Sequence, residues 1–450
     1  MRKLMRIGAF SSTRDDSPSQ VRNTEKLTAM ELIVHMGFVR TFLKIGLLSF
    51  GGPAAQIALM HRMIVEENKW LDEKQFLNAL SFCMLLPGPE AMQLATYAGW
   101  RLQGVKGGIQ AGLLFVVPGA IVILALAILY VYLGETPIIN AAFLGIKAAV
   151  LVIVLQALLR VSQRALKGSL HYALAACAFV GIFFLQLPFP FIILFAALLG
   201  AWQAHQRSEP SAAVSLPSGA LRNSVSDTLK WLLVWWVPVA SLWLLGGADI
   251  LVSLALFFSK LAVVTFGGAY AVLAYMTQDV VVQQGWLSTV EMMDGLGLAE
   301  TTPGPLILVT EFVGFVAAFR EAGLILGIVG ALVVLWVTFV PCFLWIFVGA
   351  PYIDWLSTQP RLQGAMSAIT AAVVGVILNL SVWFALHVIF EQVTEKEYGL
   401  FSLWLPDWGT VDWRVPFLSI VCGYLLLKLE WSVLKVLAAA SVAGVVVSSL

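Results

Sequence analysis

Charged residues are scarce in this chain. They make up 12% of its 450 residues, whereas hydrophobic residues make up 60% and the mean hydropathy is +0.89. A water-soluble globular domain carries about 25% charged residues, so the composition excludes that class. A net charge of +1 also offers no strongly basic surface, and we expect no nucleic-acid partner. The chain is predicted to lie in a lipid bilayer.

Motifs for catalysis and nucleotide binding are also missing. Four cysteines, Cys83, Cys177, Cys342 and Cys422, occur singly in apolar segments, which is typical of packing and not of a disulfide framework or metal site. No Walker-type sequence is present, which disfavours a primary pump. A membrane reductase would need a redox-active cysteine pair or a ligand cluster. We therefore expect no enzyme activity, no cofactor and no metal.

Apolar runs dominate the chain instead. About thirteen of them are predicted to be transmembrane helices, at about 33–60, 75–100, 108–133, 138–159, 170–186, 188–204, 229–247, 250–276, 290–318, 323–349, 362–389, 413–427 and 431–449. The fold class is therefore an all-α polytopic membrane protein. Basic residues gathered ahead of the first run predict a cytoplasmic N-terminus in the plasma membrane, and the first 30 residues lack a signal peptide.

Two motifs recur at one fixed spacing. Phe50-Gly51-Gly52 and Phe266-Gly267-Gly268 lie 216 positions apart, and the same offset carries Pro87-Gly88-Pro89 onto Pro303-Gly304-Pro305. A period this long indicates a duplicated domain. In a membrane chain, duplication is typical of a secondary transporter whose substrate site lies between the halves.

The chain is predicted to divide at a polar, Pro/Ser-rich linker. The expected parts are a cytoplasmic tail at 1–32, a first repeat at 33–204, the linker at 205–228, an extra helix at 229–249 and a second repeat at 250–450. Six segments plus the extra helix make an odd number, so the second repeat should enter the membrane upside down. We predict two inverted halves with helices broken at both motifs.

The repeated motifs are also the candidate substrate site. Glycine pairs and Pro-Gly-Pro leave backbone groups that lipid cannot satisfy. The helix that begins after such a break presents free N–H groups and a positive dipole end, which suits an anion. The alternative is a kinked, closely packed helix. Recurrence of both motifs favours a binding site that includes Gly51, Gly52, Pro87, Gly88, Pro89, Gly267, Gly268, Pro303, Gly304 and Pro305.

Three lysines are candidate cations for this anion. Lys44 and Lys260 lie six residues before the two diglycines, on otherwise apolar stretches. An ammonium at membrane depth normally has a partner or a function, so this matched pair could compensate a dianion. The alternative is that both lysines snorkel to an interface. Lys147 has no counterpart, because Thr370 occupies the equivalent position.

Acidic and amide side chains near the breaks are candidates for coupling and hydrogen bonding. Glu90, Glu300 and Glu311 either carry a coupling proton or form structural ion pairs with the lysines. Gln93 and Thr302, with its neighbour Thr301, could donate hydrogen bonds to an oxyanion. Contacts between helices are the alternative for these polar residues.

At these residues the chain resembles the chromate ion transporter family in its long two-domain form. The resemblance rests on Phe50-Gly51-Gly52-Pro53, Trp70-Leu71, Leu86-Pro87-Gly88-Pro89 with Gln93, Phe266-Gly267-Gly268, Gly285-Trp286 and Pro303-Gly304-Pro305-Leu306. It implies a plasma-membrane carrier that expels chromate and confers resistance, with proton-motive force as driver and sulfate as a competing analogue. The chain departs from the family pattern at Glu300 and Thr301-Thr302, which leaves the preferred ion open.

The expected function is export of chromate, or of a related tetrahedral oxyanion such as sulfate, by alternating access at a midplane site between the repeats. The expected partners are the oxyanion, the lipid bilayer, protons as coupling ion and a second copy in a homodimer. A passive anion channel and a sulfate uptake carrier are the alternatives, followed by a membrane-embedded enzyme.

Overall fold

A computed structural model describes residues 35–134, 136–207, 220–264, 266, 269–356, 358–399 and 401–449. The predicted N-terminal tail, half of the predicted linker and the second diglycine, Gly267 and Gly268, lie outside these residues.

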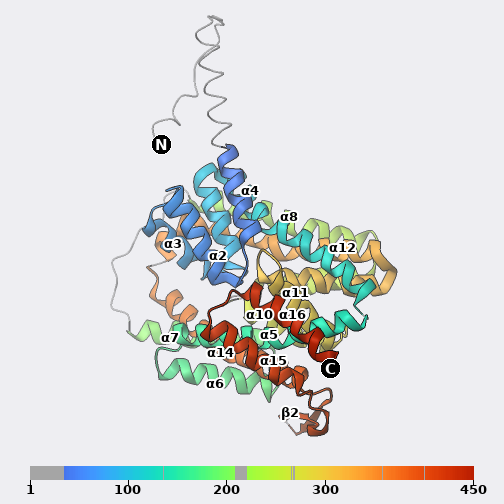
Figure 1. Ribbon diagram of the computed structural model, residues 1–450. Coiled ribbons are helices and arrows are strands. Elements are labelled where there is room, and N and C mark those ends of the chain that lie inside the picture. The colour runs from blue at the N-terminus through green and yellow to red at the C-terminus, as the bar shows by residue number, and fades with distance from the viewer. Residues whose placement is uncertain are drawn as a thin grey trace, which may run out of the picture.

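The first half of the chain is helical from its first described residue (Figure 1). A helix at 35–48 is followed by α2 (Gly52–His61), the π-helix η1 (Arg62–Glu67), α3 (Glu73–Cys83), α4 (Glu90–Leu133), α5 (Pro137–Ala165), α6 (Ser169–Phe183) and α7 (Phe189–Arg207). The predicted breaks at Gly51-Gly52 and at Pro87-Gly88-Pro89 are both present. Each interrupts a run that is apolar on either side.

The second half repeats this order of elements. It contains α9 (Asp249–Val264), α10 (Ala269–Gln278), the π-helix η2 (Asp279–Gln283), α11 (Thr289–Thr301), η3 (Leu306–Leu308), α12 (Val309–Gly349), η4 (Ala350–Tyr352), α13 (Ile353–Leu356), α14 (Pro360–Ile389), α15 (Arg414–Gly423), the π-helix η6 (Tyr424–Lys428) and α16 (Val433–Ser448). Between α14 and α15 lie an antiparallel hairpin of β1 (Val393–Tyr398) and β2 (Phe401–Pro406) and the turn η5 (Trp408–Thr410). The all-α prediction missed this hairpin.

The long elements α4 and α12 each fold back on themselves. Their backbones leave the helical region at Gln103-Gly104 and at Ala322-Gly323, where the two glycines take positive φ angles of 68° and 77°. After the first turn, Gly99 lies so close to the returning chain that an added Cβ would be 2.3 Å from the Gly107 carbonyl oxygen. Each element is therefore a pair of antiparallel helices, as the separate apolar runs predict.

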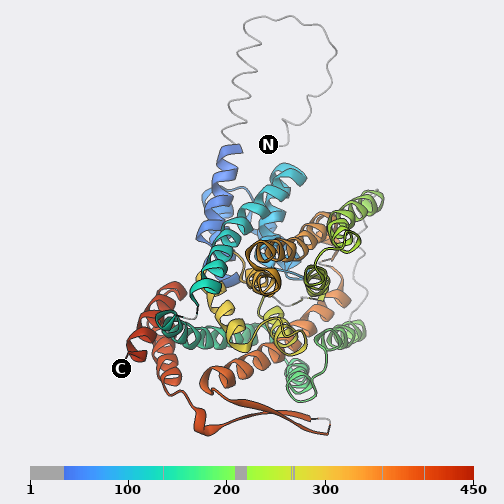
Figure 2. The same cartoon turned by 90° about the vertical axis from the view of Figure 1, so that its right-hand side faces the viewer.

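Helices of each half pack against helices of the other half. In the second half α14 packs against α6 and α7 of the first, while α5 of the first half packs against α15 and α16 of the second (Figures 1 and 2). Glycines allow these close crossings: an added Cβ on Gly200 would lie 2.2 Å from the Gly364 carbonyl oxygen, and one on Gly145 only 1.8 Å from that of Ala440. The halves consequently interlock and do not merely touch.

The helix without a partner in the first half is α8 (Ala220–Leu244), which packs against α9 and α12. The Trp235 indole N–H donates to the Ser259 hydroxyl at 3.2 Å, and the Trp231 ring stacks on Phe343. It covers the outer side of the second half and takes no part in these crossings between the halves.

Among the described residues, five helical stretches are long and apolar enough to cross a membrane. They are Glu90–Leu133, Pro137–Ala165, Phe189–Gln206, Leu306–Tyr352 and Pro360–Ile389. Shorter apolar helices, Ser169–Phe183 and Val433–Ser448, accompany them. The chain is thus a multi-pass helical membrane protein, while the count of thirteen spans and the inverted orientation stay predictions.

The inverted orientation predicts that the turns after Arg101 and Arg320 lie on opposite membrane faces. Lys106→Cys and Glu321→Cys place single exposed thiols near these turns, in a background where the exposed Cys177 is replaced by serine. A membrane-impermeant thiol reagent should label one variant in intact cells and the other only in inside-out vesicles. Labelling of both from the same side would exclude inversion.

Candidate functional site

The first diglycine, Gly51-Gly52, separates the helix at 35–48 from α2. Gly51 and Gly52 have φ angles of 85° and 76°, in the left-handed region that favours glycine. Just before the break, the Ser49 hydroxyl donates to the Ile45 carbonyl at 2.6 Å. The chain therefore turns sharply between the helix at 35–48 and α2, and its backbone polar groups become available there.

The Pro-Gly-Pro segments form matching breaks in the two halves. One separates α3 from α4, and the other separates α11 from η3 and α12. Gly88 and Gly304 have φ angles of 111° and 91°, which L side chains rarely adopt. Both segments are buried, so their backbone groups need partners inside the protein.

Gly304, in the second of these segments, has two hydrogen-bond partners in the opposite half. The Gly304 amide donates to the Ser49 carbonyl at 2.9 Å, and the Gln56 side-chain amide donates to the Gly304 carbonyl at 2.6 Å. The first diglycine break and the second Pro-Gly-Pro break thus meet at a buried junction. We call Ser49, Gly52, Gln56, Tyr270 and Gly304 the junction.

Each half also packs against the Pro-Gly-Pro break of the other half. An added Cβ on Gly119 would lie 2.2 Å from the Pro303 carbonyl oxygen, and one on Gly88 would lie 2.9 Å from the Cys342 sulfur. Gly119 and Cys342 are equivalent positions, each directly after the proline inside its long helix. Each Pro-Gly-Pro break therefore packs against the same position of the other half.

A buried carboxylate lies beside the junction. The Tyr270 hydroxyl donates to a carboxylate oxygen of Glu300 at 3.1 Å and lies 3.8 Å from the site of an added Cβ on Gly52. Glu300 also lines a small cavity together with Leu306, Leu273 and other apolar residues. Of the three predicted coupling acids, Glu300 is the one that the structure links to the junction through a hydrogen bond.

The other two acids are differently placed. Glu90 is the first residue of α4, where a carboxylate is favourable at the positive end of the helix. Leu306 occupies the equivalent position in the second half, where the acid in the first turn of α12 is Glu311. Glu311 is only 1% exposed, and one of its carboxylate oxygens has no hydrogen-bond partner among the described residues.

The predicted oxyanion donors are already engaged within the protein. The Gln93 amide donates to the Pro87 carbonyl at 2.7 Å, while the Thr301 and Thr302 hydroxyls donate to the carbonyls of Leu298 and Ala299. These contacts are local, within one break or one helix, so the donor role and the alternative of contacts between helices both stay predictions. Gln93 stabilises the first Pro-Gly-Pro turn, and the two threonines close the end of α11.

The two matched lysines do not reach the junction. Lys44 is exposed on the same helix face as the exposed Leu47 and Leu48. Lys260 is exposed as well, with its ammonium 5.7 Å from the centre of the Tyr275 ring. Both the role of these lysines as cations for the anion and the snorkelling alternative stay predictions.

Lys147 has a partner that the sequence did not reveal. Its ammonium lies 2.9 Å from a carboxylate oxygen of Asp294 on α11, and the Tyr130 hydroxyl donates to the other oxygen at 2.9 Å. Lys147 and Tyr130 belong to the first half and Asp294 to the second. This buried network joins the halves, and its carboxylate neutralises the lysine. Among the described residues no three His, Cys, Asp or Glu side chains could hold a metal ion.

Comparison with known proteins gives a single family. Residues 36–201 and 252–445 match the family described as chromate transporter, one stretch in each half. The chain belongs to the chromate transporter family. The match spans both breaks of each half and also α5 and α14, so the junction is part of the family domain.

Individual relatives agree with this assignment. The chain is 32% identical over 370 residues to a chromate transport protein of Pseudomonas aeruginosa, covering 80% of this chain and 83% of the relative. An uncharacterised transporter of Methanocaldococcus jannaschii is 28% identical over 392 residues, covering 86% of this chain and 93% of its own. An uncharacterised Bacillus subtilis transporter, YwrB, is 32% identical over 157 residues and matches 34% of this chain with 79% of its own length. No solved structure matches significantly.

Gln56 should be important for stability of this chromate transporter family member. Gln56→Met keeps the side-chain length but leaves the buried Gly304 carbonyl without its donor, which should lower the free energy of unfolding by about 1–3 kcal/mol. Thermal unfolding in detergent measures the effect. Gln110→Met makes the same change at a half-buried position of α4 outside the junction and should have little effect. Equal melting temperatures for the two variants would contradict the assignment.

Lys147 and Asp294 should behave as a coupled pair. Lys147→Met leaves a buried carboxylate without its cation and should cost about 3–5 kcal/mol, whereas the double variant Lys147→Met/Asp294→Leu should recover most of the loss. A double-mutant cycle on thermal unfolding measures the coupling, with the exposed Lys44→Met as control. Additive losses in the double variant would show that the two side chains act independently.

Proposed function

We propose that the protein exports chromate, or a related tetrahedral oxyanion such as sulfate, by proton-driven alternating access at the junction between its halves. The observation that carries this proposal is the buried hydrogen bonding of Gly304 to Ser49 and Gln56. It brings two broken helices of opposite halves to one place. Membership of the chromate transporter family supports the substrate class.

The junction has the chemistry that an oxyanion requires. The chain resumes its helix after each break, and the first N–H groups of a helix lack partners within it. At the second Pro-Gly-Pro the position equivalent to Glu90 is Leu306, and the acid in the first turn of α12 is Glu311, five residues further on. Gln56 and Tyr270 lie beside this break, with their donor groups bound to Gly304 and Glu300 in this conformation. We place the anion at this second break.

Glu300 is the proposed proton carrier. A carboxylate at membrane depth is costly and marks a functional site by default. Glu300 is buried, shares a hydrogen bond with Tyr270 and lines the cavity that extends to Leu306. Protonation would therefore change the charge directly beside the proposed anion site. Proton binding at Glu300 can therefore affect anion binding directly, without a chain of intervening proton carriers.

The junction also has to open and close. Gly304 is bound by Ser49 and Gln56 in the present conformation, and Gly119 contacts Pro303 directly. Both sets of contacts join opposite halves, so a movement of one half against the other breaks them together. We assign the observed structure to an occluded conformation of the transport cycle.

Purified protein in proteoliposomes tests this function. Uptake of labelled chromate and sulfate is measured with and without an imposed pH gradient, using empty liposomes as control. The proposal expects accumulation above the external concentration only when the gradient is present. Equilibration that ignores the gradient would identify a passive anion channel instead.

Glu300→Gln separates binding from coupling. Glutamine keeps an acceptor for the Tyr270 hydroxyl but carries no titrating proton, so chromate exchange should continue while accumulation driven by the pH gradient falls at least tenfold. Glu321→Gln, at the exposed turn inside α12, is the control and should accumulate normally. Gradient-driven accumulation by Glu300→Gln at the wild-type level would eliminate this role.

A further inference from the structure

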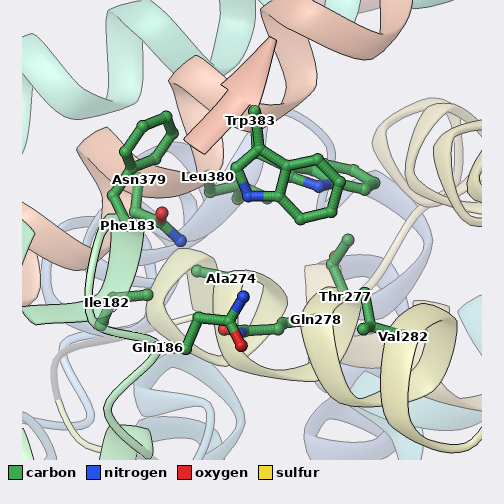
Figure 3. Close-up of a pocket in the computed structure, with 11 residues that line it drawn as sticks. Ile182, Phe183, Gln186, Ala274, Thr277, Gln278, Val282, Asn379, Leu380 and Trp383 are labelled. Carbon is green, nitrogen blue, oxygen red and sulfur yellow. The ribbon is translucent and has the colours of Figure 1, made fainter. Parts of the chain in front are cut away.

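A small pocket with several polar side chains in a mainly apolar lining lies outside the junction, between elements of both halves. The turn after α6 contributes Gln186, α10 contributes Thr277 and Gln278, α14 contributes Asn379 and Trp383, and β2 contributes Trp404. Figure 3 shows the labelled side chains around one common space. The site is therefore assembled by the interlocking of the halves and is absent from either half alone.

Thr277 gives this pocket an unused hydrogen-bonding group. Its side chain is 2% exposed, and its hydroxyl has no hydrogen-bond partner among the described residues. A buried polar group without a partner is costly, and such groups in native proteins are few. A ligand held in the pocket would supply the missing partner.

The β-hairpin fixes one wall of the pocket. The Ser402 amide donates to the Phe184 carbonyl at 2.8 Å, and the Gln186 side-chain amide donates to Glu395 on β1. The Trp404 ring contacts the His387 ring of α14 with centroids 5.4 Å apart. These contacts anchor the hairpin to the turn after α6 and to α14, so the pocket is preorganised.

No charged side chain lines the pocket. Its polar groups are a hydroxyl, amides and two indole rings. Neutral donors bind a small anion weakly and release it readily, which a site on a transport route requires. The absence of lining carboxylates removes repulsion from such an anion. The chemistry therefore favours a small oxyanion over a metal cation.

Leu380 connects the pocket to the junction. This side chain lines both the pocket of Thr277 and Asn379 and the cavity of Glu300 and Leu306. On α10 the neighbours Leu273 and Ala274 likewise divide between the two spaces. A ligand that passes Leu380 thus moves from the pocket toward the second Pro-Gly-Pro break.

We infer that this pocket is a second, low-affinity site for a tetrahedral oxyanion such as chromate, on the route between the hairpin face of the protein and the junction. The inference rests on the proposed transport function. It adds a vestibule with Thr277 and Asn379 as donors and Leu380 as the barrier to the inner site.

Sided transport kinetics test the vestibule. The half-saturating chromate concentration is measured from each face of oriented proteoliposomes, with Glu397→Cys labelling to identify the hairpin face. Thr277→Val removes the hydroxyl at nearly constant shape and should raise this concentration about tenfold from the hairpin face only. Thr277→Ser should restore the wild-type value.

Asn379→Leu is the second variant and keeps the test decisive if Thr277→Val does not fold. Its matched control is Gln156→Leu, at the equivalent position of α5 and outside the pocket lining. Wild-type values for both pocket variants on the hairpin face, or an equal rise on both faces, would overturn the vestibule. A wild-type protein without chromate flux would instead overturn the proposed transport function.

Discussion

The structure depends on one constraint: backbone groups exposed by a broken helix cannot be left facing lipid. Each half contains such breaks, and each covers a break of the other. Gly304 receives its partners from Ser49 and Gln56, and Gly119 and Cys342 pack directly against the two Pro-Gly-Pro segments. The second Pro-Gly-Pro break thus receives hydrogen bonds from the first half, whereas the first one receives the Gln93 amide of its own half.

Departures from this internal symmetry identify where the chemistry differs between the halves. The first Pro-Gly-Pro is followed by Glu90 and stabilised by Gln93, whereas the second is followed by Leu306 and has Glu300 and Tyr270 beside it. Both breaks have an acid in the first turn of the helix that follows, Glu90 and Glu311, and the second has in addition the hydrogen-bonded pair of Glu300 and Tyr270. We propose that duplication supplied the frame and that divergence in the second half supplied the function.

The sequence predicts the frame well because its motifs act locally. Glycines and prolines at Gly51-Gly52 and Pro87-Gly88-Pro89 force breaks whatever surrounds them. The lysine prediction had no such local basis, because no motif around Lys44 fixes which face of its helix is buried. The partners Gln56 of Gly304 and Asp294 of Lys147 lie more than a hundred positions away in sequence, and only the folded chain reveals them.

The central claim is that the halves must separate at the breaks during transport, and a single substitution tests it. Gly88→Cys places a thiol beside the native Cys342, which belongs to the other half and already contacts this position. Chromate flux is measured in one preparation after oxidation and again after reduction by dithiothreitol, with Gly88→Cys/Cys342→Ala as control. The account predicts loss of flux on disulfide formation and recovery on reduction in the first variant alone. Undiminished flux in the fully cross-linked protein would contradict it.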